Sequence, residues 1–229
     1  SSAGQDATNA NRSNFFGQDA GQGATDANDS NFFGRSAGNS ATNAYNSNFI
    51  GDEAGNDATN ANNSNFLGNE AGNGATDANN SNFLGSSAGQ DATNAFNSNF
   101  LGQNAGNGAT NAARSNFLGQ NAGQSATDAP DSNFIGNGAG SSATNAYESN
   151  FLGQGAGASS TGNNVNAFGT SAGNGNTLNG QTIFSNASMP SFADHTTAEA
   201  AISIPQGGSP GSTYLYHNQA TNSIGAVRL

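Results

Sequence analysis

The sequence predicts an all-β protein, a β-solenoid built from 17-residue coils. First, a Phe recurs every seventeen residues from Phe15 to Phe168. Second, an Ala-Gly pair and the phrase Ala-Thr-(Asn/Asp)-Ala keep the same interval, the pair from Ala3-Gly4 to Ala156-Gly157. Third, each unit carries several Gly, Asn and Ser, which disfavour a helix, and it lacks a helical apolar period. Short strands joined by tight corners fit such a repeat.

One repeat reads x-x-Ala-Gly-x-x-Ala-Thr-(Asn/Asp)-Ala-x-x-Ser-Asn-Phe-(Leu/Ile/Phe)-Gly, and we number its positions 1 to 17 from Ser1. The variable pairs predict turns that separate three extended segments, Ala-Gly, Ala-Thr-Asn-Ala and Ser-Asn-Phe-Leu-Gly. Stacked coils place identical residues about 4.8 Å apart, so we expect ladders of Phe on Phe and Asn on Asn. The predicted structural core is the position-15 column: Phe15, Phe32, Phe49, Phe66, Phe83, Phe100, Phe117, Phe134, Phe151 and Phe168.

Position 16 is always large and apolar. Adjacent strand residues face opposite sides, so this column points outward if the Phe column points inward. Soluble monomers avoid long exposed apolar stripes, and we therefore expect identical chains to cover it, with a homotrimer favoured. The alternative is a bend in the backbone that turns both residues inward. The predicted oligomer contacts are Phe16, Phe33, Ile50, Leu67, Leu84, Leu101, Leu118, Ile135 and Leu152.

The repeats divide the chain into three parts: nine regular repeats over residues 1–153, degenerate capping repeats over 154–184, and a small β-rich C-terminal tip over 185–229. One residue is expected to be lost after Phe168, where Gly169 resets the count. Decay of the repeat at one end is typical of a capping coil.

The tip is richer in Tyr and His than the shaft. Strands are expected near the end of 196–204, over 212–217 and over 224–229. We predict that Tyr214, Tyr216 and His217 make binding contacts, with simple capping of the shaft as the alternative.

A slower rhythm of fifty-one residues is superimposed on the repeat. Duplication of a three-repeat segment explains it without function, and contact sites that recur on every third coil are the alternative. Its members are Asp at position 9 in Asp26, Asp77 and Asp128, and an aromatic at position 11 in Tyr45, Phe96 and Tyr147.

Composition excludes several classes of protein. The chain has no Cys and no Trp, and fifteen acidic residues against four basic ones, which argues against disulfide scaffolds, thiolate metal sites and nucleic-acid binding. No apolar run approaches the roughly 18 residues of a membrane span, so membrane insertion is not expected. The chain opens in mid-repeat without Met, and we expect a processed chain or a piece of a longer one.

Catalytic residues, cofactors and metal sites are not expected. Asp194-His195, His217 and Ser212 could be imagined as a triad, but the sequence lacks a nucleophile-elbow motif. Calcium-binding repeats place Asp at a fixed position of each coil, whereas position 9 is Asn in six of nine full copies. The Thr column from Thr8 to Thr144 would form a regular hydroxyl array suited to ice, although each coil supplies only one Thr.

The phrases Ser-Asn-Phe-Leu-Gly-x-x-Ala-Gly and Ala-Thr-Asn-Ala resemble the repeats of phage tail-fibre proteins and bacterial surface adhesins, and more loosely the heads of trimeric autotransporter adhesins. Residues 213–216 and 221–225 resemble strand pieces near the ends of such fibres. The resemblance implies an extracellular, cell-surface or virion-borne fibre, trimeric, whose tip attaches to a glycan or protein receptor. The alternatives are an ice- or flat-surface-binding solenoid and a subunit of a self-assembling filament.

Overall fold

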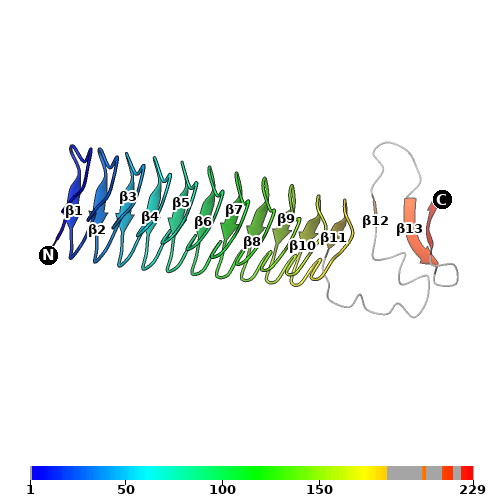
Figure 1. Ribbon diagram of the computed structural model, residues 1–229. Coiled ribbons are helices and arrows are strands. Elements are labelled where there is room, and N and C mark those ends of the chain that lie inside the picture. Colours follow the sequence, from blue (N-terminus) through cyan, green and yellow to red (C-terminus); the bar gives the residue numbers. More distant parts are fainter. Residues whose placement is uncertain (1, 185–202, 205–212, 219–222, 229) are drawn as a thin grey trace. The chain divides into compact units, whose positions relative to one another are not determined.

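The computed structural model describes residues 2–184, 203–204, 213–218 and 223–228, and the chain divides into two units, Ser1–Ala187 and Ser188–Leu229. Every regular element in the described residues is a β-strand. The first unit is a β-solenoid of 17-residue coils, which confirms the predicted fold class. Figure 1 shows its strands side by side along this unit.

The solenoid sheet contains eleven strands of three residues each, which pair in parallel and in chain order. Parallel pairing follows because each coil carries the chain fully around before the next strand begins. The strands are β1 (Asn14–Phe16), β2 (Asn31–Phe33), β3 (Asn48–Ile50), β4 (Asn65–Leu67), β5 (Asn82–Leu84), β6 (Asn99–Leu101), β7 (Asn116–Leu118), β8 (Asn133–Ile135), β9 (Asn150–Leu152), β10 (Asn166–Phe168) and β11 (Thr182–Phe184).

Each regular coil turns five side chains inward, at positions 3, 7, 10, 13 and 15. In the sixth coil these are Ala88, Ala92, Ala95, Ser98 and Phe100, all fully buried. Successive rings of the Phe column stack with centroids 4.6 to 5.1 Å apart over β2 to β9. This spacing equals the distance between neighbouring strands, so one repeat satisfies both the backbone ladder and the ring ladder.

The Gly of each Ala-Gly pair packs against the Phe ring of the preceding coil. A Cβ placed on Gly106 would lie 2.3 Å from Cδ2 of Phe100, because the ring packs directly on the Gly backbone. The interior of a coil therefore has room for one large side chain, and the remaining inward residues must be small.

The corners are made by residues with positive φ. In the second coil Asp19, Gly21, Gly23, Asp26 and Asp29 have φ between 50° and 67°. Gly adopts this left-handed region without steric cost, and Asn and Asp tolerate it better than other residues. The abundance of Gly, Asn and Asp in the sequence therefore encodes the tight corners of the coil.

The prediction of three short strands per coil is wrong in detail. Only positions 14–16 form a strand, position 8 forms single-residue bridges from Thr25 to Thr144, and the Ala-Gly segment is a turn. Left-handed residues at positions 2, 4 and 6 interrupt the extended conformation there. The backbone is still bonded between coils, as in the 2.8 Å bond from Gly38 N to Ala54 O.

The placement of Phe168 in the core is also wrong. Ala167 pairs with Phe151 in the inward column, whereas Phe168 pairs with Leu152 in the outward column. The cause is the loss of one residue before β10, since Asn150 pairs with Asn166, sixteen residues on. The sequence prediction placed this loss after Phe168, and counting by seventeen then assigned that ring to the wrong face.

A column of buried serines at position 13 fastens neighbouring coils. The Ser98 hydroxyl donates to the carbonyl of Ala112 at 2.7 Å and accepts from the backbone N–H of Ser115 at 3.1 Å. Each Ser therefore bonds to backbone groups of the following coil. Among the described residues of the regular coils, this Ser is the one buried polar side chain.

We expect Ser98→Ala to lower the free energy of unfolding by about 1–3 kcal/mol, because it leaves buried backbone groups without their partner. Urea unfolding followed by circular dichroism measures this, with the exposed Ser86→Ala as the matched control. Equal unfolding midpoints for the two variants would contradict the role of the serine column.

In the second unit the structure describes three strands, β12 (Ser203–Ile204), β13 (Thr213–Asn218) and β14 (Ser223–Arg228). They form an antiparallel sheet in the order β12-β13-β14. These positions agree with the three tip strands expected from the sequence.

Candidate functional site

The position-16 column faces outward along the solenoid. Strand residues alternate, so the inward Phe at position 15 leaves positions 14 and 16 on the outer face. Phe16 is 60% exposed, Ile50 41%, Leu84 36% and Ile135 40%, while the other predicted contacts, Phe33, Leu67, Leu101, Leu118 and Leu152, are half-buried. The alternative in which the backbone bends and both residues face inward is therefore wrong.

A ladder of Asn side chains runs beside the apolar column at position 14. In each step Nδ2 of one Asn donates to Oδ1 of the Asn in the next coil, as from Asn82 to Asn99 at 2.9 Å and from Asn99 to Asn116 at 2.9 Å. The ladder is continuous from Asn14 to Asn166. Both groups of each internal amide are thereby satisfied by the neighbouring amides.

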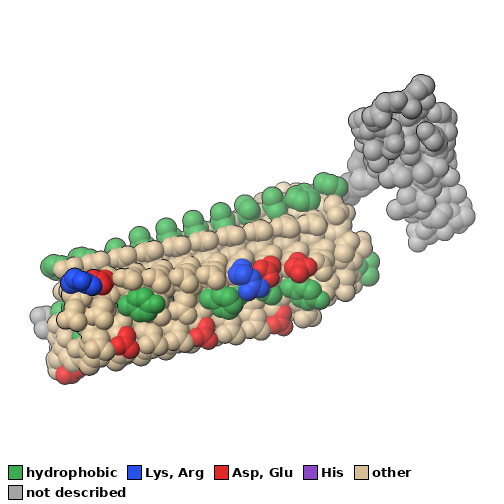
Figure 2. Space-filling view, turned by 90° about the horizontal axis from the view of Figure 1, so that it is seen from above, with side chains coloured by type: hydrophobic (Ala, Val, Ile, Leu, Met, Phe, Trp, Pro, Cys, Tyr) green, Lys and Arg blue, Asp and Glu red, His purple; other side chains and the backbone are tan. Residues whose placement is uncertain are grey.

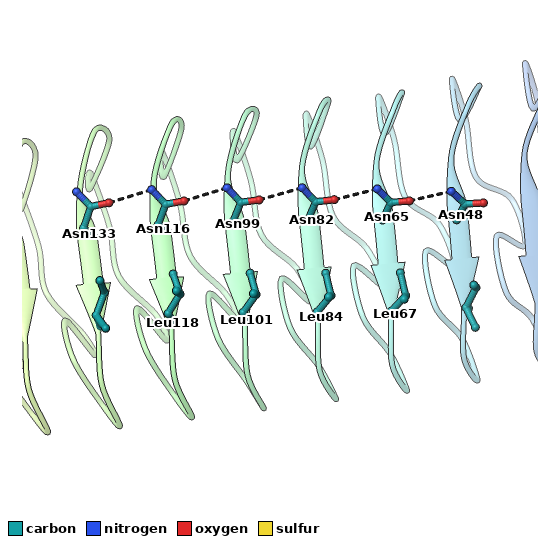
Figure 3. Close-up of a pocket in the computed structure, with 12 residues that line it drawn as sticks. Asn48, Asn65, Leu67, Asn82, Leu84, Asn99, Leu101, Asn116, Leu118 and Asn133 are labelled. Atoms are coloured by element: carbon teal, nitrogen blue, oxygen red, sulfur yellow. Dashed lines mark hydrogen bonds between the residues drawn. The ribbon is translucent and has the colours of Figure 1, made fainter.

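The apolar column and the Asn ladder form the two walls of a shallow groove along β3 to β8 (Figure 3). Its volume is about 840 Å³, and only Asn, Leu and Ile side chains line it. Positions 14 to 17 contain no charged residue in any of the nine regular coils, although the chain carries a net charge of −11. This face is therefore uncharged along its whole length, with an apolar column beside a ladder of amides.

A different face carries positions 8 to 12. Figure 2 shows hydrophobic side chains in a row along one edge of the unit, and further hydrophobic and acidic groups that recur at intervals beside it. The Thr column lies at position 8, where Thr25 to Thr144 are half-buried and joined coil to coil by parallel bridges. The side chains at position 9 lie next to this column and form a second amide ladder.

The position-9 ladder is interrupted on every third coil. Asn43 donates to Asn60 at 2.7 Å, and Asn60 donates to Asp77 at 2.6 Å. A carboxylate cannot donate to the next coil, so the run ends at the Asp. The same run is formed by Asn94, Asn111 and Asp128 and, at the start of the chain, by Asn9 and Asp26.

The aromatic residues of the fifty-one-residue rhythm lie at position 11, in the coil that follows each Asp. Tyr45 is 43% exposed and Tyr147 38% exposed, and Phe96 is half-buried. The hydroxyl of Tyr147 accepts a hydrogen bond from Nδ2 of Asn163 in the next coil. The Arg114 guanidinium lies over the Phe96 ring, 5.8 Å from its centroid.

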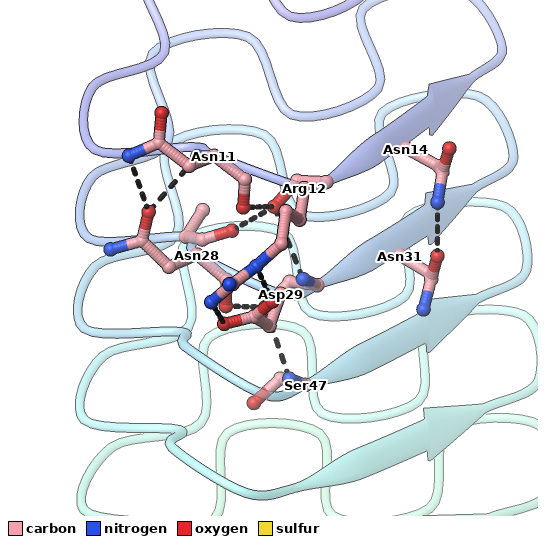
Figure 4. A network of polar contacts seen from close by, with 10 residues as sticks. Asn11, Arg12, Asn14, Asn28, Asp29, Asn31 and Ser47 are labelled. Carbon is pink, nitrogen blue, oxygen red and sulfur yellow. Dashed lines mark hydrogen bonds and ion pairs between the residues drawn. The ribbon is translucent and has the colours of Figure 1, made fainter.

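Three Arg side chains of the solenoid pair with carboxylates of the following coil. Figure 4 shows the pair of Arg12 and Asp29. Arg12 contacts Asp29 at 2.5 Å, and Arg114 contacts Asp131 at 2.6 Å. In these two pairs the hydrogen bond from the guanidinium lowers the pKa of Asp29 and of Asp131 and raises the pKa of the Arg. Such pairs stabilise the fold above the unfolded pKa of Asp and lose that effect as the pH falls through the folded pKa. Because all are exposed, the stabilisation is small.

The predicted tip contacts Tyr214, Tyr216 and His217 lie in β13, where Tyr214 pairs with Val227 and Tyr216 pairs with Gly225. The triad candidates Asp194, His195 and Ser212 lie outside the described residues.

The described residues contain neither a cluster of three or more His, Cys, Asp or Glu able to hold a metal ion nor a helix long and apolar enough to cross a membrane. The calcium alternative needed a carboxylate in every coil, whereas each Asp at position 9 has Asn in the adjacent coils.

Fold and faces together define a β-solenoid with one long uncharged face that carries an apolar column. Comparisons with protein-family models, curated proteins and solved structures found no match for this chain.

Proposed function

We propose that the chain is a structural fibre or adhesin, in which the solenoid is the shaft of a homo-oligomer and the C-terminal unit binds a surface or host-cell receptor. The shaft is held together along the position-16 column, with a trimer favoured by the resemblance to trimeric fibres. The role is mechanical, not enzymatic, and belongs outside the cell, on a cell surface or on a virion. A glycan or a protein is the receptor class.

The observation that carries this proposal is the apolar column with its adjoining groove. Nine coils stacked about 4.8 Å apart make a strip roughly 40 Å long. Soluble proteins seldom expose so long an apolar stripe. A second copy of the chain fits this strip, because every copy presents the same complementary shape: a ridge of Leu and Ile beside a groove that such a ridge can enter.

Charge distribution also favours contact between copies. Like-charged chains repel, and each copy carries a net charge of −11. The absence of charge at positions 14 to 17 removes that repulsion from this face. Stable interfaces bury about 800 Å² per partner, so the polar columns that flank the strip must contribute to the contact.

Cysteine cross-linking tests the interface directly, because the native chain contains no Cys. If the copies pack parallel and in register, Leu101→Cys is expected to form disulfide-linked dimers under mild oxidation. Thr93→Cys, on the Thr column, is the control and should stay uncross-linked. Equal cross-linking of the two variants would contradict burial of the apolar column between copies.

An ice- or flat-surface-binding solenoid is the second candidate, favoured by the straight register of the Thr column from Thr25 to Thr144. It predicts thermal hysteresis that is lost when Thr76, Thr93 and Thr110 are replaced by Asn. Replacing Asn63, Asn80 and Asn97 at position 12 by Ser is the control. A self-assembling filament is a third reading, distinguished by particles of indefinite length in place of discrete rods.

A further inference from the structure

The breaks in the position-9 ladder create pairs of hydrogen-bond acceptors. Asn43 uses Nδ2 to donate to Asn60, so its Oδ1 is directed back toward Asp26 of the preceding coil. One oxygen of Asp26 accepts from Asn9, and the carboxylate has no hydrogen to offer Asn43. Each break therefore places two acceptors, a carboxylate oxygen and an amide oxygen, at neighbouring steps of the ladder.

The arrangement recurs in full at Asp77, and the register of the coils repeats the pair of positions at Asp128. Asp77 faces Asn94, whose Nδ2 donates to Asn111, and Asp128 faces the position-9 Asn145. Three coils separate successive breaks, which is about 14 Å. Within the solenoid, the ion pairs involve other carboxylates, so Asp26, Asp77 and Asp128 keep their charge uncompensated by Arg.

An aromatic residue lies two positions after the Asn of each break. Tyr45, Phe96 and Tyr147 each follow the position-9 Asn of the break by two residues, with the inward Ala between them. The middle ring already has a cationic group over it, since Arg114 lies 5.8 Å from the centroid of Phe96. Asn63 and Asn164 take the place of Arg114 at the other two rings. Their backbone N–H groups donate to the carbonyls of Tyr45 and Tyr147, as the backbone N–H of Arg114 donates to the carbonyl of Phe96.

We propose that each break is a binding site for a primary alkylammonium group, whose head bridges the two acceptors and whose alkyl stem lies against the neighbouring ring. A hydroxyl has one hydrogen and could satisfy only one acceptor, whereas an ammonium has three. A positive charge also matches the carboxylate, the ring face and the net charge of −11.

The spacing specifies the form of a multivalent ligand. Four residues of extended peptide span about 13.5 Å, close to the rise of three coils. An extended chain with Lys at every fourth residue would therefore place its ammonium groups in register with all three breaks, and alternate residues would keep them on one side.

Tyrosine resonances report the two outer sites separately. The chain has four Tyr, of which Tyr45 and Tyr147 mark the first and third breaks, and Tyr214 and Tyr216 lie in the second unit. The intact chain, with ¹³C-labelled Tyr, is titrated with n-butylamine as the monovalent probe and with a peptide carrying Lys at every fourth residue. We expect saturable shifts of Tyr45 and Tyr147 only, and tighter binding of the peptide than of n-butylamine.

Asp26→Asn is the decisive variant, since Asn occupies this position in most coils and would continue the ladder. The variant removes the carboxylate charge, and its new amide can donate to Asn43. We therefore expect binding at Tyr45 to weaken by about two- to fivefold while Tyr147 is unaffected. Asp128→Asn should do the reverse. Asp57→Asn changes the net charge equally at an exposed corner and should affect neither ring.

A peptide with the same composition but Lys at every third residue separates register from general attraction, and should bind more weakly. Tyr45 shifts that survive Asp26→Asn, or equal shifts of all four Tyr, would overturn the proposal. So would a neutral oligosaccharide that shifts Tyr45 and Tyr147 where the amines do not, because it would assign the face to glycan stacking.

Discussion

Replacing Phe100 by Ala is expected to lower the free energy of unfolding of the solenoid by about 3–5 kcal/mol. Phe100 is fully buried and stacks on Phe83 at 4.8 Å and on Phe117 at 4.7 Å, so its loss removes contacts to two neighbouring coils. The Ala residues around it are already minimal in size and cannot fill the cavity. Urea unfolding followed by far-ultraviolet circular dichroism measures the change.

Thr93→Ala is the control for this substitution, because Thr93 lies on the outer surface of the same coil. We expect it to change the free energy of unfolding by no more than about 0.5 kcal/mol. Solenoids are stabilised by contacts between neighbouring coils, so Phe100→Ala should also split the unfolding transition into separate steps for the two halves. A cost for Phe100→Ala no greater than for Thr93→Ala would contradict the Phe ladder.

Gly102→Ala is expected to lower the free energy of unfolding by about 3 kcal/mol or more, although it adds only one methyl group. Gly102 has φ of 135°, and an added Cβ would lie 2.5 Å from the carbonyl oxygen of Gly119 in the next coil. The obstacle is backbone, which cannot rotate aside as a side chain can. The two coils must therefore separate, with loss of hydrogen bonds between them.

Gly108→Ala provides a closely matched comparison within the following coil. Gly108 also has positive φ, at 64°, but the nearest atom to its added Cβ is the Ser125 hydroxyl oxygen at 3.8 Å. Only the left-handed backbone is then penalised, at about 1–2 kcal/mol. Thermal unfolding of both variants measures the difference, and equal destabilisation would show that backbone approach between coils does not limit position 17.

The fold could be predicted because one seventeen-residue period sets both the length of the coil and the columns of stacked side chains. The Phe spacing gives the coil length, and the alternation of strand residues gives the inward and outward columns. The corner conformations could not be read so directly, since Asp, Ser, Glu and even Arg12 adopt positive φ at equivalent places. Three extended segments were expected for that reason, where the structure has one strand and one bridge.

The faces were partly predictable. The outward apolar column follows from its place directly after an inward Phe, and the structure places it there from Phe16 to Leu152. Ladders of Asn on Asn were expected, and the structure has one at position 14, whereas the inward-facing Ser at position 13 was missed, although both residues are invariant across the nine regular coils. Their unchanging identity was the available signal, since a solvated polar residue in a repeat is free to vary.

Phe168 shows where periodicity fails. It obeys the interval of seventeen, yet a one-residue shortening upstream moves it to the outward column, and Ala167 takes the inward place. A strand reverses its faces with every single-residue slip, so a sequence period identifies a face only while coil length is constant.

The mass of the purified chain in solution, measured by light scattering, tests the oligomeric shaft most directly. We predict about three times the chain mass of 22.6 kDa, and a fall to the monomer mass when Leu84, Leu101 and Leu118 are all replaced by Asn. A native chain that has a mass of 22.6 kDa at every concentration would contradict the account, because the apolar column would then be exposed to water without a partner.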